Sequence, residues 1–456
     1  MCYDGGMSKE EIVKVIAEKV KDHGGRVFYV GGCVRDRLSG IDNTDIDIEV
    51  HGVSPETLYS VLGEVGEPLS FGDSFGVYSL KGYDIDIAMP RKETAIGKGH
   101  RDFDVIVDPF IGIKNAARRR DFTVNAMMED VLTGQIEDPF HGQEDLQNKI
   151  LRHIDPKTFV EDPLRVLRAA QFASRFGFTV DKETVELCKS IDLSTLTKER
   201  VEGELKKALT KGKRPSVFFE VLKEMDQLSF WFPEVLKLDE IPQDPLYHPE
   251  GNVYVHTMEV IDRAADFREL ASDPYHFGML CLCHDFGKIV TTFEKDGHIH
   301  AYNHEKEGVP IIRTFIKRIT DNKDVMNYVI NMVPLHMKPN AVAHAKSPVK
   351  TTNKMFDQAI APLDLVLFSS CDKCIYIEGE KFTGDHEFLL ERLEIYEEMM
   401  HRPYVGGHDL ILAGLEPGED FKDILEYAHK LRLAGIEKEN ALKQTLAYAE
   451  KKRKRS

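Results

Sequence analysis

Residues 9–50 alternate between helical and extended patterns of apolar side chains. Over residues 9–22 the apolar positions recur at three- and four-residue spacing, which predicts an amphipathic helix. The short apolar run 26–30 predicts a buried strand that ends at Gly31-Gly32. Residues 45–50 then alternate polar with apolar side chains, as a strand exposed on one face does. The beginning of the chain is therefore expected to mix helix and strand.

A hairpin and a loop are predicted farther along this first part of the chain. The extended runs 78–80 and 83–87 flank Lys81-Gly82, a pair typical of a tight turn. Residues 91–104 show no apolar period and carry glycine and charge, which indicates a loop. Up to about residue 150, helices and strands are therefore expected to share one domain.

From about residue 155 the pattern changes to nearly continuous helix. Apolar residues recur at helical spacing in four successive segments: 161–176, 181–190, 197–210 and 215–228. A proline-rich stretch between residues 233 and 249 interrupts this pattern, and a second helical block follows over about 253–376. The fold class is therefore predicted to be α+β, with a mixed head followed by all-helical domains. The predicted domains are the head, two helical domains and a helical C-terminal arm, over residues 1–150, 151–250, 251–380 and 381–456.

Composition bounds the class of protein. A chain of 456 residues exceeds one ordinary core, and 42% hydrophobic with 30% charged residues is typical of a soluble globular protein. No apolar run is long enough to cross a bilayer, the first residues do not resemble a leader peptide, and the seven cysteines form no disulfide framework. We therefore expect a cytoplasmic protein with no membrane partner.

The charge of the chain is strongly negative overall but unevenly distributed. A net charge of −17 argues against a protein that coats nucleic acid indiscriminately. Local charge rather than the total sets phosphate contacts, and basic stretches occur at 118–120, 206–214 and 451–455. A nucleic-acid substrate is therefore compatible with the sequence.

Asp45 and Asp47 lie two residues apart in the predicted strand 45–50. Side chains at this spacing point to the same face, whereas Ile46 and Ile48 point into the core. Two adjacent carboxylates are costly unless a cation neutralises them. Held in this way, two magnesium ions can activate an attacking hydroxyl group and stabilise a leaving pyrophosphate. In a chain with 77 acidic residues, most such pairs are exposed to solvent and bind no metal. The neighbouring motifs therefore decide whether this pair is a metal site.

A glycine pair and an arginine precede the two carboxylates. Gly31 and Gly32 stand between a predicted strand and a predicted helix, where glycines let the backbone approach a phosphate and free N–H groups attract an anion. Arg35 lies one turn into that helix, from where it can reach a triphosphate. An ordinary Gly-Gly turn is the alternative. The combination of strand, Gly-Gly, arginine and Asp-x-Asp on the next strand favours a nucleotide site.

Two further motifs supply arginines and carboxylates. In RRRDFTVNAM (118–127), Arg120 and Asp121 can bind phosphate and a ribose hydroxyl. In EDPLRVLR (161–168), Asp162, Arg165 and Arg168 lie on one face of a helix.

The second of these motifs suits base recognition. A carboxylate accepts from the exocyclic amine of cytosine or adenine, and an arginine donates to the ring acceptor beside it. Uracil and guanine present the opposite pattern and would leave charges unpaired. A salt bridge within the helix is the alternative interpretation of Asp162 and the two arginines.

Taken in order, VGGCVRDRLSG, TDIDIEV, RRRDFTVNAM, EDPLRVLRAAQFASRFGF and KERVEGELKKAL resemble the motifs of class II tRNA nucleotidyltransferases, which are the CCA-adding enzymes and the related bacterial poly(A) polymerases. The resemblance covers about residues 26–250. It implies a DNA polymerase β-like nucleotidyltransferase head, followed by a helical neck and body that bind RNA. It also implies Mg²⁺ at Asp45 and Asp47, and addition of CMP and AMP from CTP and ATP to the 3′ end of tRNA.

The same resemblance implies roles for individual residues. Asp162 and Arg165 would form a protein template that replaces a nucleic-acid one. The nucleotide-binding residues that it implies are Gly32, Arg35, Arg120, Asp121, Asp162, Arg165 and Arg168. The segments 71–77 and 91–104 are closer to CCA-adding enzymes than to poly(A) polymerases. Polyadenylation and the partial addition of only CC or only A are alternatives.

The second helical block contains scattered histidines and carboxylates: His256, His284, Asp285, His304 and Asp372. Any one of the 18 histidines in the chain is more often a hydrogen-bonded core or surface residue. Together, these side chains suit a hard divalent metal with mixed nitrogen and oxygen ligands. A metal-bound water would then attack a phosphorus atom.

VHTMEV, CLCHDFGK and SSCDKC resemble the HD phosphohydrolase superfamily, whose ligand order is His, His-Asp, Asp. The resemblance implies that a divalent metal of unspecified identity is bound by His256, His284, Asp285 and Asp372. His304 and His336 are candidates for a second metal or for phosphate binding. The fusion of such a domain to the head resembles the gammaproteobacterial tRNA nucleotidyltransferases. A chain whose main activity is an HD-type phosphodiesterase or phosphatase is the alternative, and the intact carboxylates of the head weigh against it.

Overall fold

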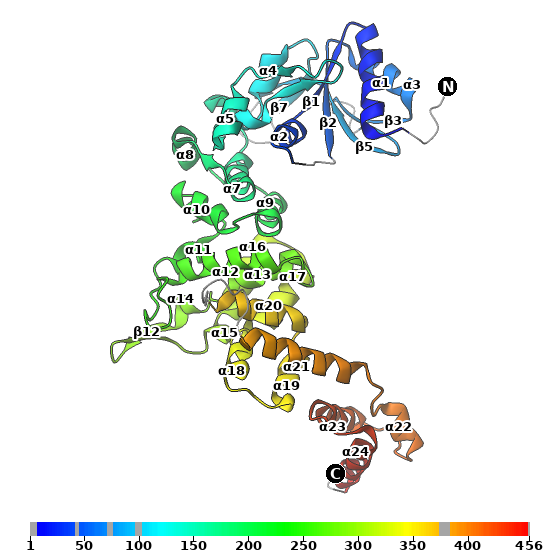
Figure 1. Cartoon of the computed structure of the whole chain (residues 1–456), viewed down its shortest axis with the longest axis vertical. Coiled ribbons are helices and arrows are strands. Elements are labelled where there is room, and N and C mark those ends of the chain that lie inside the picture. Colours follow the sequence, from blue (N-terminus) through cyan, green and yellow to red (C-terminus); the bar gives the residue numbers. More distant parts are fainter. Residues whose placement is uncertain (1–6, 42–44, 71–75, 96–102, 374–383, 455–456) are drawn as a thin grey trace. The chain divides into compact units, whose positions relative to one another are not determined.

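The computed structural model describes residues 7–41, 45–70, 76–95, 103–373 and 384–454 (Figure 1). The chain divides into two compact units, and each is described by itself. Unit 1 comprises Met1–Leu205 with Val217–Phe230, and unit 2 comprises Lys206–Ser216 with Trp231–Ser456. No helix in the described ranges combines the length and apolar character that a membrane span requires. The division into four predicted domains is finer than these two units and stays a prediction.

Unit 1 is built on a seven-stranded mixed sheet. In hydrogen-bonding order, its strands are β3 (Pro68–Ser70), β4 (Val77–Leu80), β5 (Tyr83–Ala88), β2 (Ile46–His51), β1 (Arg26–Val30), β8 (Met128–Asp130) and β9 (Ile136–Glu137). Strands β2 and β5 run parallel, and the other neighbouring pairs are antiparallel. The parallel pair places Asp47 directly beside Asp86.

Strand β1 is buried on both faces of this sheet, which explains its uninterrupted apolar run. Side chains of successive residues point to opposite faces. Val27 and Tyr29 join a core shared with the helices α1 (Lys9–Asp22) and α3 (Pro55–Val65). Phe28 and Val30 join a second core, against α4 (Ile113–Arg118). Helices therefore cover both faces of the sheet around β1 (Figure 1).

The predicted hairpin and helix near the start of the chain are confirmed. Helix α1 begins with a reciprocal cap, because Ser8 Oγ accepts from the Glu11 N–H and the Glu11 carboxylate accepts from the Ser8 N–H. Strands β4 and β5 pair antiparallel across Lys81-Gly82, where Gly82 has a positive φ of 86°.

The prediction of a loop over residues 91–104 is wrong at both ends. Strands β6 (Arg91–Ala95) and β7 (Phe103–Val107) form an antiparallel ribbon, paired from Arg91 with Val107 to Ala95 with Phe103. Main-chain hydrogen bonds hold this ribbon, and Ile106 remains 57% exposed on it. Val107 packs against the neighbouring core, but each strand is only five residues long and the stretch between them carries glycine and charge. The sequence pattern is therefore that of a loop.

The four helices predicted between residues 161 and 228 are confirmed: α7 (Leu164–Phe176), α8 (Lys182–Lys189), α9 (Lys198–Lys211) and α10 (Ser216–Glu224). Helix α7 starts later than predicted because the Asp162 carboxylate accepts from the N–H of Leu164 ahead of the first turn. It ends at Gly177, whose φ of 71° lies in the left-handed region that favours glycine.

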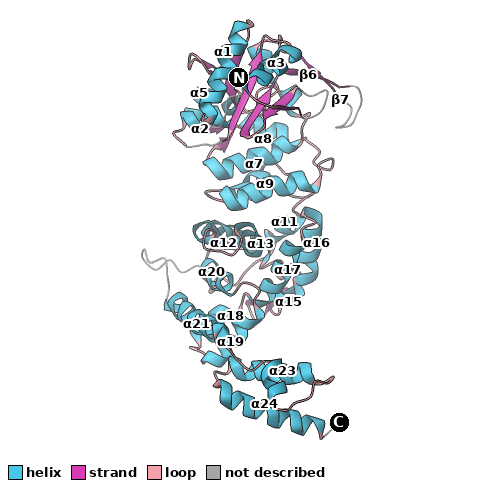
Figure 2. Ribbon diagram, turned by 90° about the vertical axis from the view of Figure 1, so that its right-hand side faces the viewer, coloured by secondary structure: helices cyan, strands magenta, loops and turns pink. Residues whose placement is uncertain are grey.

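Unit 2 is almost entirely helical, as the sequence predicts for most of it. Its helices are α11 (Pro233–Leu238), α12 (Val253–Phe267), α13 (Pro274–Cys283), α14 (Lys288–Thr291), α15 (His304–Glu307), α16 (Val309–Ile319), α17 (Lys323–Met332), α18 (Lys338–His344), α19 (Val349–Gln358), α20 (Pro362–Asp372), α21 (Gly384–His401), α22 (Gly407–Leu412), α23 (Phe421–Leu433) and α24 (Lys438–Arg453). Helices α12, α13 and α20 pack against one another (Figure 2).

One hairpin interrupts the helices of unit 2, where the sequence analysis predicted none. Strands β12 (Thr292–Lys295) and β13 (His298–Ala301) pair antiparallel. Asp296 and Gly297 form the turn between them, both with positive φ (53° and 76°). An Asp-Gly pair is a strong hairpin signal, so this element was detectable from the sequence.

The buried carboxylate of Asp364 links two helices and one loop of unit 2. The side chain is fully buried near the start of α20. One oxygen accepts from the Tyr328 hydroxyl at 2.5 Å and from the Ser272 hydroxyl at 2.6 Å, and the other accepts from the Ser272 N–H at 2.9 Å. The Tyr328 side chain is itself buried, so its hydroxyl depends on this acceptor.

Replacing Asp364 with alanine is expected to lower the free energy of unfolding by about 1–3 kcal/mol, because the buried Tyr328 hydroxyl loses its hydrogen-bond acceptor. Urea unfolding followed by circular dichroism measures this. The control is Asp324→Ala, which removes an exposed carboxylate on α17 and should change the free energy by about 0.5 kcal/mol or less. Equal stability of the two variants would contradict the prediction.

Candidate active site and histidine cluster

Three carboxylates lie side by side on the sheet of unit 1. Asp45 directly precedes β2, Asp47 lies in β2, and Asp86 lies opposite Asp47 in the parallel strand β5. Burial and the neighbouring Asp86 carboxylate raise the pKa of Asp47, against the opposing charge of Arg120. Carboxylates that repel one another in this way are typical of a cation site.

Asp45 and Asp47 are expected at this site from the sequence, whereas Asp86 is not. A signal was present, because Asp84-Ile85-Asp86 alternates just as Asp45-Ile46-Asp47 does. What the sequence does not show is that the two strands are parallel neighbours.

Gly31 brings the backbone close to these carboxylates. It has a φ of 69° and stands directly before helix α2 (Gly32–Leu38). A Cβ atom built on Gly31 would lie 3.4 Å from Arg120 Nη1 and 3.9 Å from Asp47 Oδ2. Gly31, Asp47 and Arg120 therefore converge at one point, as the spacing of the motifs predicts, and a side chain at position 31 would crowd that point.

Arg35 is buried rather than exposed to a ligand. Its Nη1 donates to Asn125 Oδ1 at 2.7 Å and its Nε donates to Asp36 Oδ1 at 2.8 Å. The guanidinium lies over the Phe176 ring, 4.2 Å from its centroid. These contacts join α2 to α7 and to the motif that carries Arg120, so Arg35 holds the site together in this structure.

Asp121 is likewise engaged with protein partners. One carboxylate oxygen accepts from Arg168 Nε at 2.8 Å, and the other accepts from Asn125 Nδ2 at 2.9 Å and from the Phe122 N–H at 2.8 Å. Burial opposes ionisation of Asp121, but Arg168 and these hydrogen bonds hold its pKa below the ordinary value. The predicted residues Asp121 and Arg168 are therefore brought together, as an ion pair.

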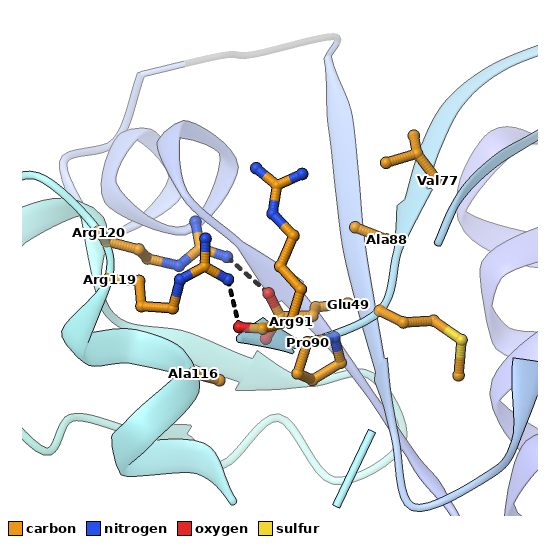
Figure 3. Close-up of a pocket in the computed structure, with 9 residues that line it drawn as sticks. Glu49, Val77, Ala88, Pro90, Arg91, Ala116, Arg119 and Arg120 are labelled. Carbon is orange, nitrogen blue, oxygen red and sulfur yellow. Dashed lines mark hydrogen bonds and ion pairs between the residues drawn. The ribbon is translucent and has the colours of Figure 1, made fainter. Parts of the chain in front are cut away.

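A cavity of about 280 Å³ opens beside Arg120 (Figure 3). Its lining residues are Glu49, Val77, Ala88, Met89, Pro90, Arg91, Ala116, Arg119 and Arg120. Arg120 Nη2 donates to Glu49 Oε2 at 3.2 Å, and Arg119 donates to the carbonyl of Arg91. Arg120 Nε is buried and makes no hydrogen bond within the described residues. Three guanidinium groups around one cavity suit a polyanion such as a triphosphate.

Asp162 and Arg165 have separate partners. Both oxygens of Asp162 accept from Arg200 Nη2 of α9, at 3.0 and 3.1 Å. Arg165 donates from Nη1 to the Thr158 carbonyl at 2.6 Å and from Nη2 to the Arg119 carbonyl at 2.7 Å. The alternative of a salt bridge within α7 is therefore not what the structure contains at Asp162. Arg200 is a partner that the sequence analysis did not name.

The sequence of this chain is similar to those of known proteins. The family model of the poly(A) polymerase head domain matches residues 27–152. A multifunctional CCA protein of Actinobacillus pleuropneumoniae is 37% identical over 339 residues, which cover 73% of this chain and 80% of that protein. The chain belongs to the family of CCA-adding tRNA nucleotidyltransferases. A multifunctional CCA protein of Pseudomonas fluorescens is also 37% identical, over 68% of this chain and 74% of that protein.

Solved structures of CCA-adding enzymes share the fold of this nucleotidyltransferase. The Thermotoga maritima CCA-adding enzyme complexed with tRNA superimposes with a TM-score of 0.64 at 22% identity, over 96% of this chain and 95% of that one. The Bacillus stearothermophilus CCA-adding enzyme in complex with CTP gives 0.65 at 20% identity, over 99% and 100% of the two chains. The predicted CCA tRNA nucleotidyltransferase class is confirmed, whereas the HD domain stays a prediction.

Unit 2 of the enzyme contains a second cluster, of four histidines and two aspartates. Its members come from different helices and loops of unit 2: His256, His284, Asp285, His304, His336 and Asp372. All four imidazole rings are buried. Two sets of donor atoms, each within 4.8 Å of one another, are His256, His284, Asp372 and Asp285, His304, His336. The structure therefore brings together all six residues that the sequence suggested.

The Nδ1 atoms of the four rings are all bound to acceptors. His284, His304 and His336 donate from Nδ1 to the carbonyls of the residues three positions earlier, Cys281, Ala301 and Val333, at 2.6–2.8 Å. His256 donates from Nδ1 to Glu250 Oε1 at 2.8 Å. In a neutral ring this arrangement leaves Nε2 as an acceptor.

The Nε2 atoms face one another and the two carboxylates. His304 Nε2 lies 3.2 Å from His336 Nε2 and 3.2 Å from Asp285 Oδ1. His256 Nε2 lies 3.1 Å from Asp372 Oδ1. His284 Nε2 is buried and has no hydrogen bond of good geometry among the described residues. Acceptors that converge in this way repel one another unless cations lie between them.

The charges around the histidine cluster also favour a bound cation. Burial opposes ionisation of Asp285, but Lys288, whose Nζ lies 2.8 Å away, and His284 hold its pKa well below the ordinary value. Burial and the neighbouring His284 lower the pKa of His336 to about 4, so this ring is neutral at pH 7. A proton on His304 would remove the repulsion at one of these acceptor contacts. Divalent cations would remove the repulsion among all the converging acceptors together.

Proposed function

We propose that the enzyme completes the 3′ end of tRNA by adding CMP and AMP from CTP and ATP, without a nucleic-acid template. The observation that carries this proposal is the convergence of Gly31, Asp47 and Arg120 beside a cavity ringed by arginines. That arrangement puts a carboxylate pair for metal and a cradle for triphosphate next to each other. The relatives named for CCA addition, and the solved enzymes with CTP and with tRNA, support the same substrates.

In this proposal Asp45 and Asp47 hold Mg²⁺, and Asp86 completes the carboxylate set. The raised pKa of Asp47 supports a cation there, because a divalent ion would relieve the repulsion that raises it. Bound Mg²⁺ supplies activation of the tRNA 3′-hydroxyl and neutralisation of the leaving pyrophosphate. Arg91, Arg119 and Arg120 orient the triphosphate in line with that hydroxyl.

The remaining predicted residues have supporting roles in the proposed nucleotide site. Gly32 begins the helix beside the phosphates, and Arg35 positions it by tying α2 to Asn125. The Asp121–Arg168 ion pair fixes the motif that carries Arg120. Asp162 and Arg165 are proposed to read the base, with Asp162 held by Arg200 until a nucleotide amine competes for it.

The direct test is incorporation of labelled CTP and ATP into tRNA that lacks its 3′ terminus. Mg²⁺ should support incorporation, and EDTA should abolish it. Product length separates complete CCA addition from the CC-, A- and poly(A)-adding alternatives. An enzyme that is mainly an HD-type hydrolase would incorporate neither nucleotide.

Replacing Arg165 with lysine is expected to reduce the preference for CTP and ATP over UTP and GTP by about 10–100-fold, since lysine lacks the planar fork that pairs with a base edge. Single-turnover incorporation of each of the four nucleotides measures this preference. Lys182→Ala, which removes an exposed cation at the start of α8, is the control and should leave the preference unchanged. A larger change in Mg²⁺ requirement than in nucleotide preference would discredit the template role.

We also propose that unit 2 contains a divalent-metal phosphohydrolase centre of the HD type. The Nε2 atoms that converge on Asp285 and Asp372 support this, because every one of them is oriented as a metal ligand would be. His256, His284, Asp285 and Asp372 would hold one ion, and Asp285 would share a second with His304 and His336. A bound divalent cation supplies a water of lowered pKa for attack on a phosphoester.

A further inference from the structure

Glu250 lies behind the histidine cluster, between two imidazole rings. Its Oε1 accepts from His256 Nδ1 at 2.8 Å and from His248 Nδ1 at 2.9 Å, and its side chain is only 6% exposed. The two rings pack edge to face with centroids 5.0 Å apart. One carboxylate oxygen therefore receives two imidazole protons in a nearly dry pocket.

The loop that carries Glu250 is fixed where it enters helix α12. Gly251 follows with a φ of 127°, a conformation that side-chain-bearing residues rarely adopt. Asn252 then caps helix α12 by accepting from the Val255 N–H, and its amide donates to the Asp239 carbonyl. His248 and Glu250 are thus held against the first turn of the helix that carries His256.

His256 differs from the other three histidines of the cluster in its Nδ1 partner. Within the described residues, His284, His304 and His336 each use a backbone carbonyl, which no side-chain substitution removes. His256 uses the Glu250 carboxylate, with its Nε2 directed at Asp372. A carboxylate partner fixes the ring, keeps the proton on Nδ1 and makes Nε2 a stronger ligand.

We propose that Glu250 is a positioning residue that holds His256 ready to bind a cation through Nε2, and that His248 anchors Glu250 in turn. The inference rests on the proposed metal centre of unit 2. Glu250 itself is not a ligand, because its Oε1 and both Nδ1 atoms are already at hydrogen-bonding distance, and the two protons occupy the space between them. Its contribution is therefore made entirely through the orientation and basicity of His256.

Metal affinity measured directly tests this proposal. The full-length chain would carry Asp45→Ala and Asp47→Ala, so that the head contributes no binding, and Mn²⁺ would be titrated into it by calorimetry after chelator treatment. Adding Glu250→Gln, which keeps the shape but allows either tautomer of His256, is expected to weaken Mn²⁺ binding by about 10–100-fold. The control is Asp244→Asn in the same loop. The Asp244 carboxylate pairs with His298 at 2.9 Å and accepts from the Leu246 N–H at 3.0 Å, and neither partner belongs to the cluster, so the affinity should be unchanged.

The outcomes separate the two proposals. If neither the parent chain nor its His284→Ala variant binds Mn²⁺ in unit 2, the metal centre itself is wrong. If the parent binds and Glu250→Gln binds equally tightly, the positioning role is wrong. It is also wrong if Glu250→Gln lowers the number of bound ions by one at unchanged affinity, since His248, Glu250 and His256 would then have held an ion themselves.

A change in folding is distinguished by a second variant and a second measurement. The thermal midpoint of each metal-free chain reports whether the buried substitution disturbs unit 2. If Glu250→Gln lowers that midpoint, His248→Gln tests the same network from its half-buried outer side. His248→Gln should also weaken Mn²⁺ binding, by a smaller factor than Glu250→Gln, and unchanged affinity in a folded His248→Gln chain would overturn the inference.

Discussion

Replacing Asp47 with alanine is expected to lower CTP incorporation into tRNA by roughly 10³-fold. Asp47 lies opposite Asp86 in the sheet, and its Oδ2 and Arg120 Nη1 both lie close to Gly31. Loss of a metal-holding carboxylate removes several kcal/mol of transition-state stabilisation, and each 1.36 kcal/mol is tenfold in rate. Initial rates of labelled CTP incorporation at saturating Mg²⁺ measure the effect.

The matched control for Asp47 is Asp84→Asn. Asp84 also lies in β5, two residues from Asp86, but its carboxylate pairs with Lys9 at 3.0 Å. This exposed ion pair contributes little, so the variant should keep nearly the full rate. Incorporation by Asp47→Ala at the rate of the Asp84→Asn control would remove Asp47 from the catalytic site.

Replacing Asp285 with asparagine is expected to reduce any hydrolysis of 2′,3′-cyclic nucleotides by unit 2 at least about 100-fold. Asp285 contacts both donor sets of the cluster, with His284 Nε2 and His304 Nε2 each 3.2 Å from one of its oxygens. Asparagine keeps the shape but removes the negative charge with which Asp285 would help to hold divalent cations, which costs several kcal/mol. The reaction is followed with several divalent metals in turn.

Asp324→Ala serves as the control here too, because this exposed carboxylate lies outside the cluster. His284→Ala should behave like Asp285→Asn, since both remove a proposed ligand. Hydrolysis at unchanged rate in both cluster variants would show that the reaction takes place elsewhere in the chain. CTP incorporation reports that unit 1 of each preparation is folded, and the thermal midpoint of each chain reports on unit 2.

Four of the seven strands of the sheet (β1, β2, β4 and β5) and its first two carboxylates could be predicted from local pattern alone. Alternation along residues 45–50 placed Asp45 and Asp47 on one face, and β2 has that orientation. Asp86 could not be placed in the same way, because its position depends on the parallel pairing of β2 with β5, which is a tertiary contact. Local patterns reveal which residues share a strand face but not which strands are neighbours.

Charged residues of the head were predicted by type and not by partner. Arg35 was expected at the phosphates, but Asn125, Asp36 and Phe176 surround its guanidinium. Helical spacing predicts Asp162 and Arg165 on one face. In the structure, Asp162 pairs with Arg200, and Arg165 donates to backbone carbonyls. Burial and long-range partners decide these contacts, and neither leaves a signature in residue spacing.

The histidine cluster shows the same division. The ligand order could be predicted from resemblance, and the fold brings those residues together. The acceptors of the histidine Nδ1 protons could not be predicted, because the carbonyls of Cys281, Ala301 and Val333 belong to the backbone rather than to side chains. Glu250 is a side chain, but its relation to His256 requires the turn at Gly251 that only the structure reveals.

The most direct test of the head is the length and sequence of its product. Transcribed tRNA ending before its 3′ CCA would be incubated with the full-length enzyme, Mg²⁺, CTP and ATP, and the extended 3′ ends would be sequenced. The convergence of Gly31, Asp47 and Arg120 beside the arginine-lined cavity predicts that the 3′ end is extended. The proposed CCA addition predicts that the added residues are C, C and A, followed by a stop. A long adenosine tail, or no extension at all, would contradict the proposed CCA addition.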